Sequence, residues 1–198
     1  MARKSLEKIK EEQKITIRQL SIAYSFLLSA MVIFLYSTHN INLNLYNVDV
    51  SIMNLLFPLV FFLSCVTVKE LGYKYGLRAV IVSTIVLFFY GAFCNFFVTG
   101  NFNIYSIGVI TLAYFTTQSI CLSVYNYFLV YSRLPILVVI SNYVFSCLVY
   151  NMIYMLFNYK MVVSGSFWLE YFLIVLLQGV LSIVLSIFDS IVERGIDE

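Results

Sequence analysis

A run of 54 residues, from Ala79 to Ser132, contains no Asp, Glu, Lys or Arg. A helix that crosses a hydrocarbon core of about 30 Å needs about 20 mainly apolar residues, so this run is long enough for two crossings. Only 11% of the residues in the chain are charged, whereas a soluble globular domain carries about a quarter. Because so few charges cannot form a conventional polar surface, the sequence predicts an integral membrane protein.

Polar or turn-like breaks divide the apolar sequence into six segments. The segments are Leu20–Tyr36, Ser51–Val68, Ala79–Val98, Ile107–Tyr131, Ile136–Phe157 and Phe167–Phe188. An unpaired backbone amide is very unfavourable in lipid, so each segment must be a helix or belong to a closed barrel. Continuous apolar runs such as Ile81–Phe89 lack the alternation of barrel strands. The predicted fold is all-α, a polytopic membrane protein with six transmembrane helices.

Basic residues are concentrated in alternate connections between these segments. Eleven of the 12 Lys and Arg residues precede the first segment, follow the sixth, or lie between the second and third or the fourth and fifth. Only Lys160 lies on the opposite side. Since short cytoplasmic loops carry the excess of Lys and Arg, we expect both termini to be cytoplasmic. The net charge of only +2 suggests no nucleic-acid partner.

The chain is predicted to have three parts: a basic cytoplasmic segment (1–19), the six-helix membrane domain (20–188) and a cytoplasmic tail (189–198). Within the first part, apolar or uncharged residues recur at helical spacing, with lysines around the rest. They are Leu6, Ile9, Gln13, Ile17 and Leu20. This pattern is typical of a helix lying along the membrane surface. A solvated basic tail that only sets the topology is the alternative.

The sequence contains no recognisable catalytic or metal-binding motif. The four cysteines, Cys65, Cys94, Cys121 and Cys147, all lie in predicted spans without CxxC spacing, so neither a zinc site nor a disulfide framework is indicated. The single histidine, His39, falls in the first outer loop. HExxH, GxSxG and glycine-rich phosphate loops are absent from the sequence. We therefore expect no enzyme activity, no metal and no cofactor.

Uncharged polar residues form stripes within the predicted spans. On the fourth segment, Thr111, Tyr114, Gln118, Cys121 and Tyr125 are three or four residues apart and share one helical face. The fifth segment carries a similar stripe of Tyr143, Ser146, Tyr150 and Tyr154, with Asn142 and Asn151 beside it. These stripes are either the lining of a site or interhelical hydrogen-bonding groups, which are common in membrane bundles.

Two pairs of polar residues lie at matching depths. Gln118 and Gln178 are each 11 residues into their segments, and Cys65 and Cys121 are each 14 residues in. At a rise of 1.5 Å per residue, both glutamines are about 16 Å deep, near the bilayer midplane. We therefore expect four spans to converge on one cavity. The predicted substrate-binding residues are Asn54, Cys65, Tyr114, Gln118, Cys121, Tyr125, Asn142, Tyr150 and Gln178.

A lining of amides, phenols and hydroxyls suits a flat, polar, uncharged ligand such as a nucleobase. Aromatic rings would stack on such a ligand, and amides would bind its donor and acceptor edges. Proton-coupled carriers generally hold a charged residue at mid-membrane, and none is predicted here. Facilitated diffusion, or import driven by metabolic trapping, fits this sequence better.

Several stretches resemble the queuosine precursor transporter family. Phe57–Phe61 has the family's aromatic-proline start, and Lys69–Ala79 has its acidic residue, glycines and basic turn. Ala113–Gln118, followed by Tyr125, is similar to the family's fourth span, and Ser141–Asn142 to its polar fifth span. The resemblance implies a multi-pass protein of the bacterial cytoplasmic (inner) membrane that imports a deazaguanine precursor of queuosine.

The resemblance covers the chain from about Asn54 to Arg194, with clear departures. Where family acids are expected in spans two and four, this chain has Cys65 and Cys121, and near the family's span-six acid it has Gln178. Proton coupling through those positions is therefore not predicted.

The leading hypothesis is thus a membrane importer of a small planar heterocycle. One alternative is the substrate-binding subunit of a vitamin importer, which would dock on a separate energising complex through small residues on its cytoplasmic half. Another is a structural membrane protein without a ligand. The expected partners are the lipid bilayer and a small-molecule substrate, with a homo-oligomer or an energising complex as open alternatives.

Overall fold

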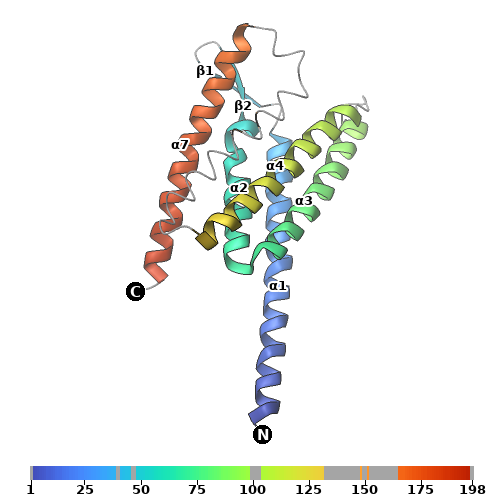
Figure 1. The fold of residues 1–198 in the computed structure, drawn as a ribbon. Helices are drawn as coiled ribbons and strands as arrows, with labels where there is room; N and C mark the ends of the chain where they lie inside the picture. The colour runs from blue at the N-terminus through green and yellow to red at the C-terminus, as the bar shows by residue number, and fades with distance from the viewer. Residues whose placement is uncertain are drawn as a thin grey trace.

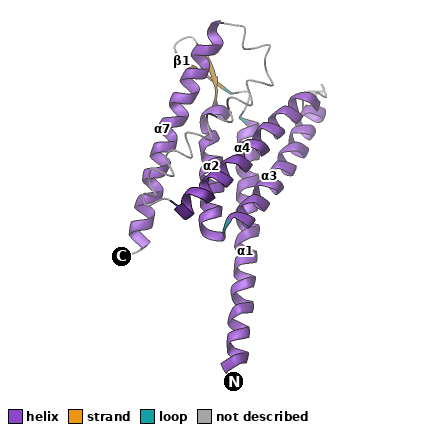
Figure 2. Ribbon diagram, viewed as in Figure 1, coloured by secondary structure: helices purple, strands orange, loops and turns teal. Residues whose placement is uncertain are grey.

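The computed structural model describes residues 2–38, 41–45, 48–98, 104–131, 148, 151 and 165–196. Over these residues the chain is helical except for one short hairpin (Figure 1 and Figure 2). The helices are α1 (Ala2–Ser37), α2 (Ile52–Leu71), α3 (Tyr73–Phe93), α4 (Ile104–Tyr131) and α7 (Gly165–Ile196). A π-helical turn, η1 (Cys94–Val98), continues α3, and the strands are β1 (Asn42–Leu45) and β2 (Val48–Ser51). The predicted all-α class is confirmed for these residues.

Four of these helices are long enough and apolar enough to span a membrane. The stretches that qualify are Gln13–Ser37 of α1, Tyr73–Phe97 of α3 and η1, Ile107–Val130 of α4, and Tyr171–Asp189 of α7. The second predicted span corresponds to α2, which has 20 residues. The fifth, Ile136–Phe157, lies outside the described residues except for Leu148 and Asn151.

Helix α2 occupies the centre of the bundle because it packs against α1, α3, α4 and α7. Its apolar side chains Phe57, Val60, Phe61 and Val68 are buried among those neighbours. Helices α2, α4 and α7 run in the opposite direction to α1 and α3, so the N-terminal end of α1 and the C-terminal end of α7 lie at the same end of the bundle (Figure 1). At that end α1 extends beyond the other helices as one continuous helix from Ala2.

A single residue, Gly72, joins α2 to α3. Its φ of +89° lies in the left-handed region that favours glycine, and its carbonyl accepts hydrogen bonds from the amides of Tyr75 and Gly76 at the start of α3. Gly76 approaches α2 so closely that a Cβ there would collide with the side chain of Val68. Two glycines thus allow the α2–α3 reversal to be completed within about one turn.

A β-hairpin connects α1 to α2, in a segment that the sequence predicts to be only an outer loop. Strands β1 and β2 are antiparallel, and Leu43 pairs with Val50. The alternation of Asn and Leu in β1, and of Val with Asp in β2, is the two-residue period of a strand. Val50 is fully buried and packs with Ile174 of α7, so the hairpin holds the N-terminal part of α7 against the bundle.

Candidate functional site

The polar stripe predicted on α4 faces the interior of the bundle. Tyr114, Gln118, Cys121 and Tyr125 are each at most 2% exposed. Their spacing of four, three and four residues keeps them on one face of the helix, while Tyr127 and other residues on the opposite face are exposed. The α4 stripe therefore provides a column of buried polar groups beside α2 and α3.

Cys65 of α2 and Cys121 of α4 meet in this interior. Their Sγ atoms are 4.0 Å apart, and both side chains are fully buried. Both cysteines are free thiols. The matching depth predicted for this pair is therefore realised as a direct contact between two helices.

The phenol of Tyr114 is held in one orientation by α3. Its hydroxyl oxygen lies 2.7 Å from Ser83 Oγ, and Ser83 Oγ lies 2.9 Å from the carbonyl oxygen of Val80. Because a serine hydroxyl has one proton, and Ser83 donates it to Val80, Tyr114 must donate to Ser83. The ring of Tyr114 also packs edge-to-face against Phe57 at 6.1 Å between centroids. Tyr114 is thus fixed, with its phenol oxygen still able to accept a hydrogen bond.

Gln118 lies one turn further along α4 and is the most unusual polar residue of the bundle. Its side chain is fully buried, yet neither Oε1 nor Nε2 has a hydrogen-bond partner among the residues that the structure describes. Leaving a buried donor or acceptor unpaired costs about 1–3 kcal/mol, so most buried amides in proteins are bonded. An amide with both ends unpaired, placed between Tyr114 and Cys121, is a group with capacity for a ligand.

Gln178 of α7 is equally buried but is bonded. Its Oε1 accepts a hydrogen bond of 2.7 Å from Asn151 Nδ2. One and two turns further along α7, the hydroxyls of Ser182 and Ser186 donate to backbone carbonyls of their own helix. Although they occupy matching depths in the sequence, the two glutamines therefore have different roles: Gln178 joins two parts of the chain and Gln118 does not.

Three of the predicted site residues cannot be assigned contacts. Asn54 lies in the first turn of α2, and its side chain is outside the described part of the structure, as are Asn142 and Tyr150 entirely. The six that are described, Cys65, Tyr114, Gln118, Cys121, Tyr125 and Gln178, are all buried. Among these six, the structure brings the two cysteines into contact and places Gln178 on a separate helix, α7.

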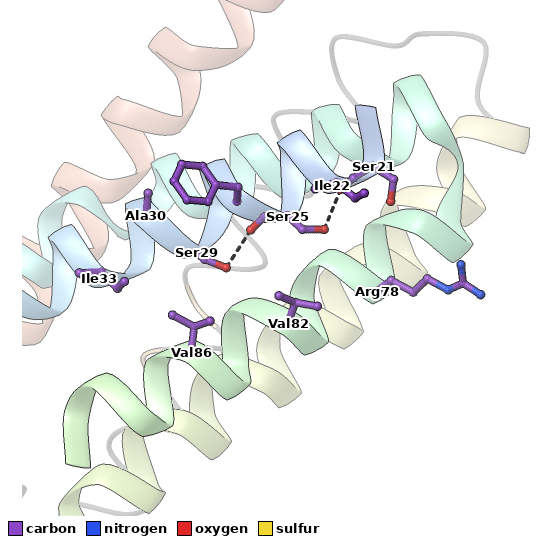
Figure 3. A pocket seen from close by; sticks show the side chains of 10 residues that line it. Ser21, Ile22, Ser25, Ser29, Ala30, Ile33, Arg78, Val82 and Val86 are labelled. Carbon is purple, nitrogen blue, oxygen red and sulfur yellow. Dashed lines mark hydrogen bonds between the residues drawn. The ribbon is translucent and has the colours of Figure 1, made fainter. Parts of the chain in front are cut away.

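Two apolar grooves lie elsewhere on the bundle, and no predicted site residue lines either. The first lies between α1 and α3 and has a volume of about 600 Å³ (Figure 3). The second, of about 490 Å³, is formed by α1, α2 and α7. The described members of the α4 stripe, Tyr114, Gln118, Cys121 and Tyr125, are buried in the bundle and line neither groove.

Other polar contacts involve residues outside the predicted site. Ser83 and Asn151 bind predicted site residues but were not in the predicted set, because one belongs to an apolar run and the other was noted only beside a stripe. Beyond the C-terminal end of α3, Asn95 of η1 donates to the Tyr36 hydroxyl at 3.1 Å, and Tyr36 packs edge-to-face with Tyr90. The widened π-helical turn that carries Asn95 leaves no trace in the residue pattern.

Among the described residues, no three His, Cys, Asp or Glu side chains are grouped so that they could hold a metal ion. No protein-family model, curated protein or solved structure matches the chain.

Proposed function

We propose that this chain is a non-enzymatic membrane importer of a small, planar, uncharged heterocycle. The observation that carries the proposal is the buried amide of Gln118, whose donor and acceptor both lack a partner within the described part of the chain. Such an amide matches the adjacent donor and acceptor groups on the edge of a nucleobase-like ring. A ligand that bonds to both groups would remove the unfavourable free energy of the unpaired donor and acceptor. The side chain is therefore suited to binding a ligand rather than to packing.

The surroundings of Gln118 support a neutral ligand. Among the described residues, no Asp, Glu, Lys, Arg or His side chain is buried, so the interior offers no charge to balance an ion. The oxygen of Tyr114 can accept a further hydrogen bond, and the thiol of Cys121 lies one turn from Gln118 on the same face. By the sequence resemblance, a deazaguanine precursor of queuosine is the first candidate ligand.

We further propose six spans with both termini in the cytoplasm of a bacterium. This topology is supported by the ion pair between Lys69 at the end of α2 and Asp189 near the end of α7, with 3.2 Å between Nζ and Oδ2. The pair lies near the end of the bundle where both termini lie. Reporter fusions at Glu198 should report the cytoplasm, and a cysteine placed at His39 should react with an impermeant maleimide from outside.

The function is tested by expression in a bacterium that cannot make queuosine precursors and lacks its own importer. With limiting cyano- or aminomethyl-deazaguanine in the medium, the wild-type chain should restore queuosine in tRNA. Gln118→Ala should abolish restoration. Thr116→Val, two residues away on α4, is the matched control, because the Thr116 hydroxyl bonds to carbonyls of its own helix, and it should leave import unchanged.

Absence of queuosine with the wild-type protein present in the membrane would reject the deazaguanine ligand. Restoration that survives Gln118→Ala would retain import but move the binding site away from the α4 stripe.

A further inference from the structure

The groove between α1 and α3 is long and apolar and lies on the outside of the bundle. From α1 it is lined by Ile22, Phe26 and Ile33 together with smaller residues, and from α3 by Val82 and Val86 (Figure 3). The lining runs from Ser21 to Ile33, about 18 Å along α1 at 1.5 Å per residue. That length is slightly more than one leaflet of a hydrocarbon core about 30 Å thick.

The hydroxyl groups in the groove leave its wall apolar. Ser25 Oγ donates to the carbonyl of Ser21, and Ser29 Oγ donates to the carbonyl of Ser25, both at 2.8 Å (Figure 3). Because these protons are used within α1, the small serine side chains widen the groove without requiring a polar occupant. An acyl chain fits this wall.

One end of the groove is cationic. Arg78 lines it at the end where Ser21 lies (Figure 3). The guanidinium is exposed and 5.7 Å from the ring centroid of Tyr75, and within the described residues it has no acidic partner. Arg18 and Lys14 precede Ser21 by three and seven residues on the same face of α1, and both are exposed. Three exposed basic side chains, those of Arg78, Arg18 and Lys14, therefore belong to this end of the groove.

The second groove lacks this feature. It is lined by Leu27, Ala30, Met31, Leu59, Phe62, Leu63, Leu185 and Phe188, none of which is charged. Both grooves have an apolar wall, but only the first has a charged residue at its end. The second groove is therefore a control within the same molecule.

We propose that the α1–α3 groove is a binding site for one anionic phospholipid. An acyl chain lies along Ile22, Val82 and Val86, and the phosphate is bound between Arg78 and Arg18. The charge complementarity is that of basic sites between membrane helices, which bind anionic head groups on the cytoplasmic side. Arg78 belongs to the basic turn predicted on that side, where the leaflet carries anionic lipids.

The test is native mass spectrometry of the full chain in detergent, with dioleoyl phosphatidylglycerol and dioleoyl phosphatidylcholine as probes with identical acyl chains. The wild-type protein should bind one phosphatidylglycerol in preference to phosphatidylcholine. Each cation near an anionic surface contributes a factor of about five in affinity. Arg78→Gln should therefore lower phosphatidylglycerol affinity about fivefold, and Arg78→Gln with Arg18→Gln about 25-fold.

Three further variants locate the site. Val82→Trp should fill the α1–α3 groove and remove the bound lipid, whereas Leu185→Trp in the second groove should leave the phosphatidylglycerol preference intact. Arg194→Gln removes the same charge from the last turns of α7 and should have no effect. Arg78 is exposed, so its substitution leaves the core undisturbed even if Val82→Trp fails to fold.

Equal affinity for the two lipids would overturn the proposal. So would an unchanged preference in the Arg78 and Arg18 variants, or a loss of preference in Arg194→Gln. Lipid-free dimers that disappear with Val82→Trp would place a second copy of the chain in the groove, and would equally overturn it.

Discussion

The Sγ atoms of Cys65 and Cys121 lie 4.0 Å apart in the fully buried interface between α2 and α4. Both helices run in the same direction (Figure 1), so residues at equal depth along them lie at one level. The contact fixes the register of α2 against α4. It also places two polarizable groups one turn from the unpaired amide of Gln118.

This register predicts that a mercuric ion bridges the two thiols. Two thiolates neutralise one Hg²⁺, so the complex is uncharged and tolerates burial, and soft metals prefer thiolate ligands. With Cys94 and Cys147 replaced by Ser, the protein should bind one Hg²⁺ that excess monothiol removes slowly, measured by native mass spectrometry. Cys65→Ser and Cys121→Ser should each abolish this slow release.

Stoichiometric, rapidly exchanging binding at each thiol would contradict the register. If only one of the two single variants lost slow release, the cysteine replaced in it would bind Hg²⁺ together with a ligand other than the second thiol.

Helical periodicity was sufficient to predict the α4 stripe. Residues such as Tyr114, Gln118 and Cys121 recur every three or four positions, and a buried helix must place such a set on one face. The α2–α3 turn was equally accessible, because Gly72 and Gly76 permit a reversal that other residues hinder. Local spacing of residues determines both features, so both could be predicted from the sequence alone.

Pairings between helices were not accessible in the same way. Nothing in the spacing of α3 selects Ser83 over Thr84 as the partner of Tyr114, because that choice depends on the rotation of two helices. The same holds for Gln118 and Gln178, which have equal depth in the sequence, whereas only Gln178 acquires a partner, Asn151. The sequence gives the depth of a residue along its helix, whereas its contacts also depend on the rotation of the helix and on which helices are its neighbours.

We expect Gln118→Leu to stabilise the protein. The substitution removes a buried donor and a buried acceptor that have no partners among the described residues, and such groups cost about 1–3 kcal/mol. The free energy of unfolding in mixed micelles should therefore rise by about that amount, while import falls in the queuosine assay. A stability loss would mean that the amide is bonded in the unliganded protein, and would remove the basis for its role in binding.

Gln178→Leu should have the opposite effect on stability, because it leaves the buried Asn151 Nδ2 without its acceptor. Interhelical hydrogen bonds in membranes contribute about 0.6 kcal/mol on average and at most about 1.7 kcal/mol. A double-mutant cycle with Asn151→Leu, measured by unfolding in mixed micelles, should give a coupling energy in that range. Additive effects of the two substitutions would show that the contact contributes nothing.

The Lys69–Asp189 ion pair should contribute measurably to the packing of α7 on α2. The side chains are 23% and 16% exposed, between a surface pair, which contributes at most about 1 kcal/mol, and a buried one, whose disruption costs 3–5 kcal/mol. Asp189→Asn should lower the free energy of unfolding by about 1–2 kcal/mol.

The exchanged variant, Lys69→Asp with Asp189→Lys, should recover part of this loss and keep the number of basic residues at that end of the bundle. Recovery would be detected by thermal unfolding in detergent beside both single variants. An exchanged protein less stable than either single variant would indicate that contacts with other neighbours, and not the ion pair, account for the stabilising effect of these two charges.

Gly76→Ala should destabilise the protein although alanine is the better helix former. The new Cβ would collide with the side chain of Val68, and overpacking typically costs about 1–3 kcal/mol, against a gain of about 1 kcal/mol from helix propensity. Shortening the opposing side chain with Val68→Ala should relieve the collision, so the double variant should be more stable than the sum of the two single effects on the free energy of unfolding predicts.

Gly72→Ala is the matched control: its cost arises from a φ of +89° with no atom within 4 Å of the added Cβ, so Val68→Ala should not rescue it. Rescue of both glycine variants, or of neither, in detergent unfolding would show that close packing of α2 on α3 is not what requires Gly76.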